Sequence, residues 1–88
     1  MIHTVVKRDG RIVGFNEEKI ITAIRKAMLH TDKGEDMSLI RQITDHISFR
    51  GDAQMTVEAI QDMVELELMK SSRKDVAQIL CRKGAGVY

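Results

Sequence analysis

The 88 residues of this chain are enough for one domain and too few for two. With 43 % hydrophobic and 31 % charged residues, the chain can bury a modest core. That core must be aliphatic, because only two phenylalanines and one tyrosine are present. The formal net charge of +1 argues against a general nucleic-acid binder, which usually carries a basic excess.

A single cysteine, Cys81, excludes an internal disulfide and a zinc site built from several cysteines. Its apolar neighbours favour a part-buried thiol in a reducing compartment. No apolar run approaches the length of a membrane span, and the first residues lack the pattern of a signal peptide. We therefore expect a cytoplasmic protein without a membrane partner.

Two short runs rich in valine, isoleucine and threonine, residues 2–7 and 11–15, predict β-strands. Asp9 and Gly10 lie between them and predict a type I′ hairpin turn, in which both central residues have positive φ. The chain therefore begins with a predicted β-hairpin.

The hairpin leads directly into a predicted helix of about 13 residues, for which Asn16 is the expected N-cap. A polar connector over residues 30–37 separates it from a second helix, which starts near Asp36 or Ser38. This second helix should stop before Gly51, which is typical of the glycine that follows a helix.

After a short link, Thr56 is the expected N-cap of a third helix. Ser71 and Ser72 interrupt this helix, and residues 72–75 resemble a capping box that opens a fourth. A hairpin alone is only marginally stable in water, so it needs a helical surface to cover. We therefore predict an α+β fold in which a small N-terminal β-hairpin or sheet caps a four-helix bundle. The domain should span residues 1–83, and residues 84–88, which lack periodicity, should form a flexible tail.

Basic side chains are concentrated on the hairpin and the first helix. They are Lys7, Arg8, Arg11, Lys19 and Arg25. Considered alone, the hairpin charges indicate a solvated turn. The first turn of a helix, however, presents free N–H groups that favour an anion, and Lys19 lies there. Several cations around one pocket would suit a polyphosphate.

Sequence signals for catalysis are absent. There is no Gly-x-x-x-x-Gly-Lys-Ser/Thr loop and no Gly-x-Gly-x-x-Gly after a strand. His3, His30 and His46 lie far apart and off metal-ligand spacing. We therefore expect a non-catalytic chain without a tightly bound metal.

The opening stretch resembles the ATP-cone, a small nucleotide-sensing domain at the N-terminus of many ribonucleotide reductases. The family signature is roughly Val-x-Lys-Arg-Asp-Gly, an apolar or small pair, Phe-Asn/Asp, and then Lys-Ile. The matching residues are Val5, Lys7, Arg8, Asp9, Gly10, Phe15, Asn16, Lys19 and Ile20. The resemblance covers nearly all of residues 3–83 and implies the same hairpin-plus-helices arrangement.

This resemblance also implies a nucleotide site. The implied nucleotide-binding residues are Val6, Lys7, Arg8, Asp9, Gly10, Asn16, Lys19, Ile20, Thr56 and Arg82. In the family the basic residues and the turn glycine hold the phosphates, and a basic residue of the last helix, matched here by Arg82, reaches them too. Four of these positions have a structural alternative: Asn16 and Thr56 as helix caps, and Val6 and Ile20 as core residues.

The function implied by the resemblance is that of an allosteric domain that binds ATP or dATP, with Mg²⁺ as an optional companion ion. It would control a ribonucleotide reductase through nucleotide-dependent packing or oligomerisation, with the rest of the reductase chain or another cone as partner. Residues 71–77 favour the anaerobic glycyl-radical type, a ribonucleoside-triphosphate reductase. The alternative is the nucleotide-sensing half of a transcriptional repressor, although the zinc ribbon of such repressors is absent here. A helical DNA-binding module is the weakest alternative, because no basic recognition helix is present.

Overall fold

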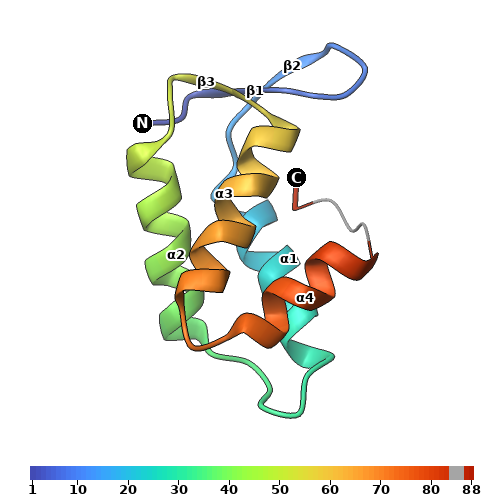
Figure 1. Cartoon of the computed structure of the whole chain (residues 1–88). Coiled ribbons are helices and arrows are strands. Elements are labelled where there is room, and N and C mark those ends of the chain that lie inside the picture. The colour runs from blue at the N-terminus through green and yellow to red at the C-terminus, as the bar shows by residue number, and fades with distance from the viewer. Residues whose placement is uncertain (84–86) are drawn as a thin grey trace.

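The computed structural model describes residues 1–83 and 87–88, with backbone only for residues 81–83. A small sheet lies across one end of a group of helices (Figure 1). In the described part of the chain the strands are β1 (Thr4–Val6), β2 (Ile12–Gly14) and β3 (Gln54–Thr56). The helices are α1 (Glu17–Leu29), α2 (Met37–Arg50), α3 (Val57–Lys70) and α4 (Lys74–Lys83). The predicted α+β fold is confirmed.

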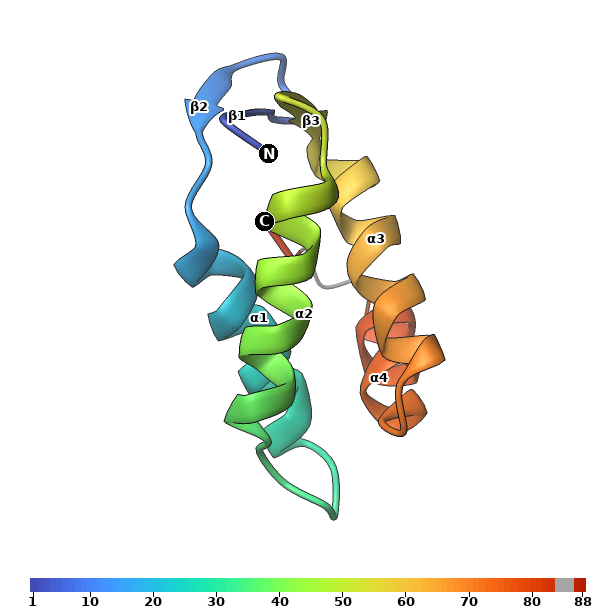
Figure 2. The ribbon, with the colours of Figure 1, turned by 90° about the vertical axis from the view of Figure 1, so that its left-hand side faces the viewer.

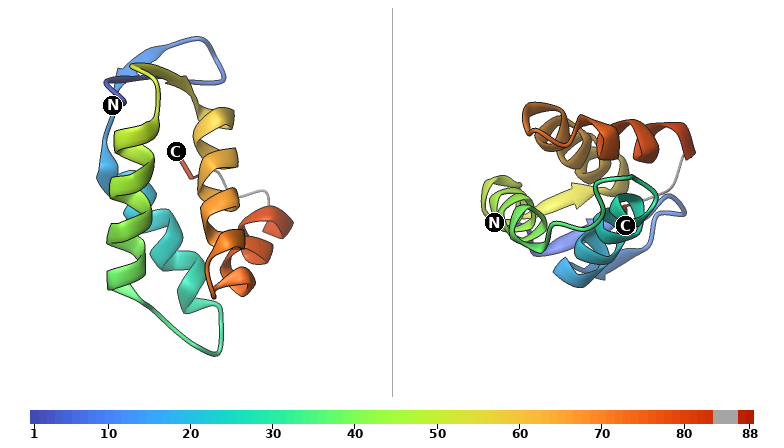
Figure 3. Two further views of the ribbon diagram at one scale, coloured as in Figure 1. Left: turned by 60° about the vertical axis from the view of Figure 1, so that its left-hand side comes forward. Right: turned by 90° about the horizontal axis from the view of Figure 1, so that it is seen from below.

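The helices form two neighbouring pairs, α1 with α2 and α3 with α4 (Figures 2 and 3). Their inner faces carry an aliphatic core, in which Ile20, Ile24, Ile40, Ile60 and Leu68 have no exposed surface. Burying each such side chain contributes about 1.5–3 kcal/mol. None of the helices in the described residues combines the length and the apolar character that a membrane crossing requires.

The sheet contains one strand more than the predicted hairpin. Its order is β2-β1-β3, with β1 antiparallel to β2 and parallel to β3. The sequence predicts a link over residues 51–55 and a helix N-cap at Thr56, because a strand of three residues is too short to show a β alternation. The pairing places Thr56 beside Val6 and so brings the start of α3 to the hairpin.

The predicted type I′ turn is wrong. Gly10 has φ +90°, but Asp9 does not have a positive φ. The Gly10 N–H donates to the Lys7 carbonyl at 2.9 Å, and the Lys7 N–H donates to the Arg11 carbonyl at 2.8 Å. These bonds define a type I turn followed by a left-handed glycine, the common form of a three-residue hairpin loop. The Asp9 carboxylate fixes this loop by accepting from the Arg11 backbone at 3.1 Å and from its Nε at 2.7 Å.

The two predicted helix N-caps, Asn16 and Thr56, are confirmed, and α2 begins near Asp36 as expected. Asn16 Oδ1 accepts from the Glu18 N–H at 3.0 Å, and α1 has the expected 13 residues. Asp36 and Thr56 cap α2 and α3 by accepting backbone N–H groups at 3.2 and 3.1 Å. Each cap satisfies a donor that has no partner within its helix.

Gly51 ends α2 as predicted, but not through a left-handed conformation. Its φ is −70° and its ψ is 156°, which other residues also adopt. The glycine is required because a Cβ atom here would lie 2.6 Å from the Ile2 Cδ1 atom. The N-terminal segment packs tightly at this point, and the Ile2 N–H donates to the Ser48 carbonyl at 3.0 Å.

A buried arginine, rather than the predicted capping box, organises the start of α4. Ser71, not Ser72, accepts the Arg73 N–H, at 3.1 Å. The Arg73 guanidinium donates to Thr31 Oγ1 and to the Gly34 carbonyl, both at 2.9 Å, and to Asp75 Oδ1 at 3.2 Å. With only 6 % of its surface exposed, Arg73 joins the connector between α1 and α2 to the first turn of α4.

The Ile2 side chain leaves no room for a methyl group on Gly51. Gly51→Ala should lower the free energy of unfolding by about 1–3 kcal/mol, because Ile2 must move or leave its rotamer. Urea unfolding followed by circular dichroism measures the change. Gly14→Ala is the control, since no atom lies within 4 Å of a Cβ there. Equal midpoints for both variants would contradict the steric explanation.

The second prediction concerns acid stability. Burial raises the pKa of Asp75, but the hydrogen bond and charge of Arg73 outweigh it, so the pKa lies below the usual 3.8. A lowered native pKa stabilises the fold above the unfolded value and loses that contribution as pH falls through the native value. Asp75→Asn should therefore lower the free energy of unfolding at pH 6 by up to about 1 kcal/mol, a figure discounted for partial exposure. The difference should disappear near pH 2.

The matched control for this acid effect is the same substitution in an Arg73→Met background. There Asp75→Asn should lose its pH-dependent effect, because the guanidinium that lowers the pKa of Asp75 is gone. Urea unfolding at pH 6 and pH 2 completes this double-mutant cycle. A pH dependence that survives without Arg73 would show that another group stabilises the carboxylate.

Candidate functional site

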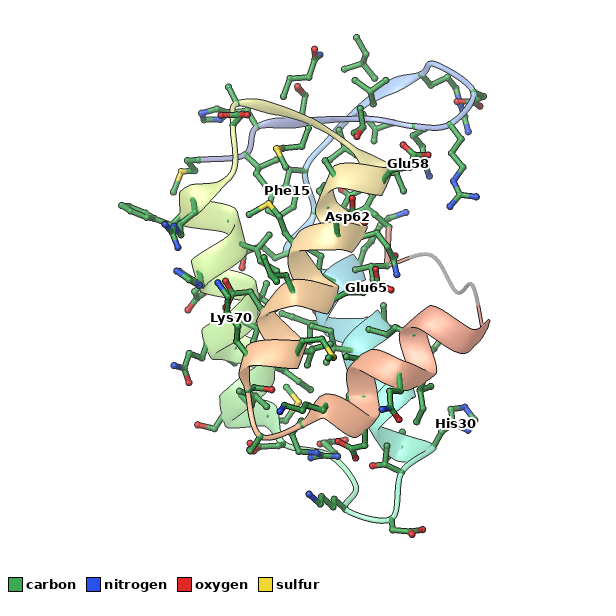
Figure 4. All side chains as sticks on the ribbon, in the orientation of Figure 1. Phe15, His30, Glu58, Asp62, Glu65 and Lys70 are labelled. Atoms are coloured by element: carbon green, nitrogen blue, oxygen red, sulfur yellow. The ribbon has the colours of Figure 1, made fainter. Side chains whose placement is uncertain are left out.

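The hairpin loop and the start of α3 form the first half of the candidate site. Val6 pairs with Thr56 in the sheet, and Arg8 Nε lies 3.2 Å from Glu58 Oε1 in the first turn of α3. Figure 4 shows Glu58 at the end of α3 that faces the hairpin. The structure therefore brings Val6 and Arg8 to Thr56 and Glu58, residues that lie 50 positions later in the sequence.

The junction between β2 and α1 forms the second half. Asn16 caps α1, and Lys19 lies in its first turn with an exposed side chain. Both residues contact Tyr88: the Asn16 N–H donates to the tyrosine hydroxyl at 2.6 Å, and Lys19 Nζ lies 5.5 Å from the ring centroid. The two halves are held at one end of the helices by β1, which pairs with both other strands.

Two of the predicted cations are not engaged by acidic groups. Arg8 is paired with Glu58, and Arg11 with Asp9 at 2.7 Å. Among the described side chains, neither Lys7 nor Lys19 takes part in an ion pair. Lysines without carboxylate partners near two helix N-termini favour an anionic ligand.

The remaining predicted residues have other positions. Asp9 holds the turn through Arg11, which gives it a structural contact in the ligand-free chain. Ile20 is fully buried in the core, whereas Val6 is half-buried at the edge of the site. The side chain of Arg82 lies outside the described residues.

A cavity of about 570 Å³ extends from this second half along α1, within the usual size of ligand pockets. Its walls come from one face of α1, from α4, and from Val87 and Tyr88. The residues that line it are Glu18, Lys19, Thr22, Ala23, Lys26, Ala27, His30, Ile79, Leu80, Val87 and Tyr88. Figure 4 shows His30 at the far end of α1.

Most residues that line this cavity were not predicted from the sequence. One face of α1 carries Lys19, Lys26 and His30. Their helical spacing is visible in the sequence, but the apolar stripe of the core lies beside them and gives the stronger pattern. Tyr88 gave no signal, because it lies in a segment without periodicity and was assigned to the tail. In the part of the chain with described side chains, no group of three or more potential metal ligands occurs.

The sequence of this chain matches a known protein family. A profile of the ATP cone domain matches residues 3–83. The chain is 45 % identical over 73 residues to the vitamin B12-dependent ribonucleoside-diphosphate reductase of Thermoplasma acidophilum, covering 81 % of this chain and 9 % of that protein.

Two further relatives are alpha subunits of ribonucleoside-diphosphate reductase. The protein of Chlamydia pneumoniae is 32 % identical over 88 residues, covering 88 % of this chain and 8 % of its own length. That of Chlamydia trachomatis is 36 % identical over 88 residues, covering 85 % and 8 %. None of these three is named an anaerobic or a triphosphate reductase, so the expected reductase type stays a prediction. The repressor alternative is not favoured, and the chain belongs to the ATP-cone domain family.

Proposed function

We propose that this chain is an allosteric domain of a ribonucleotide reductase and that it binds ATP or dATP. The observation that supports the proposal is the pairing of β1 with both β2 and β3. It sets the hairpin loop with Lys7 beside Thr56 at the start of α3, and β2 leads from the same sheet into α1, whose first turn carries Lys19. The reductase names of the relatives support the proposal, although the chain spans less than a tenth of their length. The catalytic activity would belong to the remainder of such a protein.

The phosphates would lie between the hairpin loop and the first turns of α1 and α3. Charge-assisted bonds from Lys7 and Lys19, together with free N–H groups at the helix starts, would hold several negative charges. Arg8 would join them once it leaves Glu58, an exposed pair whose separation costs little. Mg²⁺ could accompany the nucleotide as part of the ligand.

The regulatory effect would arise from a shift between packing states. The hairpin is joined to α3 through β3 and to α1 through β2, so a ligand between them contacts both helix pairs. A nucleotide that fits one arrangement better than another moves the equilibrium by that difference in affinity. A partner, either another cone or the rest of the reductase, would detect the change at an exposed surface. Phe49 on α2, which is 74 % exposed, is suited to such a contact.

The first test of this function is titration calorimetry with ATP and with dATP, accompanied by an assay for phosphate release. Binding without hydrolysis is expected. Lys7→Ala and Lys19→Ala should each weaken binding by roughly one to two decades, since a charge-assisted hydrogen bond contributes about 1.5–3 kcal/mol. Lys70→Ala is the matched control, because Lys70 lies at the other end of α3 (Figure 4).

Three results would count against the proposal. Absence of heat with either nucleotide at millimolar concentration would exclude binding. Equal affinities for the two lysine variants and for Lys70→Ala would show that Lys7 and Lys19 are only solvated charges. Steady release of phosphate would contradict a regulatory role without catalysis.

The second test concerns the pairing of Arg8 with Glu58. Glu58→Gln removes a carboxylate beside the proposed phosphate position and releases Arg8. Nucleotide affinity should rise about two- to fivefold, the range expected for an exposed ion pair worth less than about 1 kcal/mol. Glu65→Gln, two turns further along α3, is the control and should change nothing (Figure 4). Weaker binding by Glu58→Gln would place this carboxylate on the ligand instead.

A further inference from the structure

Tyr88 makes four contacts at the junction of β2 and α1. Its hydroxyl donates to the Gly14 carbonyl at 2.9 Å and accepts the Asn16 N–H at 2.6 Å. Its ring stacks on Phe15 with a centroid separation of 6.0 Å and an interplanar angle of 11°. Lys19 Nζ lies over the same ring, 5.5 Å from its centroid. Stacking and cation–π contacts of this kind each contribute to holding an aromatic ring in place.

These contacts use groups that the proposed site also needs. Asn16 and Lys19 are both expected nucleotide-binding residues, and Tyr88 engages the backbone of one and the cation of the other. While the Asn16 N–H and the Lys19 ammonium are held at Tyr88, they cannot turn to a bound nucleotide. Tyr88 and a nucleotide that uses these two groups would therefore exclude each other.

Val87 fixes the same segment to the opposite helix. Its N–H donates to the Gln61 side-chain oxygen on α3 at 2.7 Å, and only 2 % of its surface is exposed. Residues 87 and 88 therefore connect α3 to α1 beneath the sheet, where Figures 1 and 3 show the C-terminal end among the helices. Displacing Tyr88 would remove a link between the two helices whose first turns border the site.

We propose that Tyr88 is an internal competitor of the nucleotide: it occupies part of the site in the ligand-free chain and must leave when the nucleotide binds. This inference rests on the proposed function. The apparent dissociation constant would equal the intrinsic one divided by the fraction of molecules with Tyr88 undocked. Nucleotide binding would thereby release Tyr88 from the junction of β2 and α1.

The first experiment compares nucleotide affinity by calorimetry in the whole chain. Tyr88→Ala should bind ATP about tenfold more tightly than the parent if Tyr88 is docked in about nine molecules of ten. Tyr88→Phe keeps the ring and loses both hydroxyl bonds, so its affinity should lie between the two. Leu66→Ala, which truncates an exposed apolar residue on α3, is the control and should bind like the parent.

The second experiment observes displacement directly in the unmodified chain. Tyr88 is the single tyrosine, so its ring protons give an isolated NMR signal. Without ligand, a nuclear Overhauser effect should connect the Tyr88 and Phe15 rings. Saturating ATP should abolish it and move the tyrosine resonances toward those of a solvent-exposed ring.

The outcomes separate this inference from the proposed function. If the parent binds ATP while the Tyr88–Phe15 contact persists, or if Tyr88→Ala binds no more tightly, the competitor role is wrong and the nucleotide site stands. Weaker binding by Tyr88→Ala would show instead that the ring is a platform for the ligand. If neither the parent nor Tyr88→Ala binds a nucleotide, both the competitor role and the proposed function are wrong.

Discussion

The positions of α1 and α3 depend on one strand, β1, which pairs with β2 on one side and with β3 on the other. Three residues provide both sets of bonds, and the middle one, Val5, is fully buried against the helices. Because β2 continues into α1 and β3 continues into α3, this strand fixes where both helices begin. The N-terminal ends of α1 and α3 therefore face the same region, and the hairpin loop extends from the same sheet.

This constraint is compatible with the proposed polyanion site in a chain whose net charge is only +1. Lys7, Arg8, Arg11 and Lys19 lie on the hairpin and in the first turn of α1, a turn that also carries Glu17 and Glu18. Arg8 and Arg11 are neutralised locally in the ligand-free chain, whereas the contacts of Lys19 are with an aromatic ring. Local charge, rather than total charge, determines what the surface attracts.

The opposite end of the helices is held differently, by the buried guanidinium of Arg73. Its donors satisfy oxygens of the α1–α2 connector and of α4, so a single side chain joins these two segments. A buried arginine of this kind is stable because its charge is paired and its donors are used. The sheet and Arg73 thus secure the two ends independently. Between the two ends, Tyr88 is held by its hydroxyl bonds to Gly14 and Asn16 and by its contacts with Phe15 and Lys19.

The features that follow from the sequence alone are local. The N-caps at Asn16 and Thr56, the start of α2 near Asp36 and the hairpin at the start of the chain depend on residues within a few positions of one another. The resemblance to the ATP-cone rested on such a local signature, and it indicated the correct fold and family.

Only the tertiary structure revealed β3, the steric need for Gly51, the role of Arg73 and the position of Tyr88. In each case the decisive partner is distant in sequence: Arg73 contacts Thr31 across 42 positions, and Tyr88 contacts Asn16 across 72. No local pattern in the sequence marks a three-residue strand, a glycine that packs against another segment, or a tyrosine outside any periodic element. Their roles are set by which surfaces the folded chain brings together, and the pattern of nearby residues does not encode that.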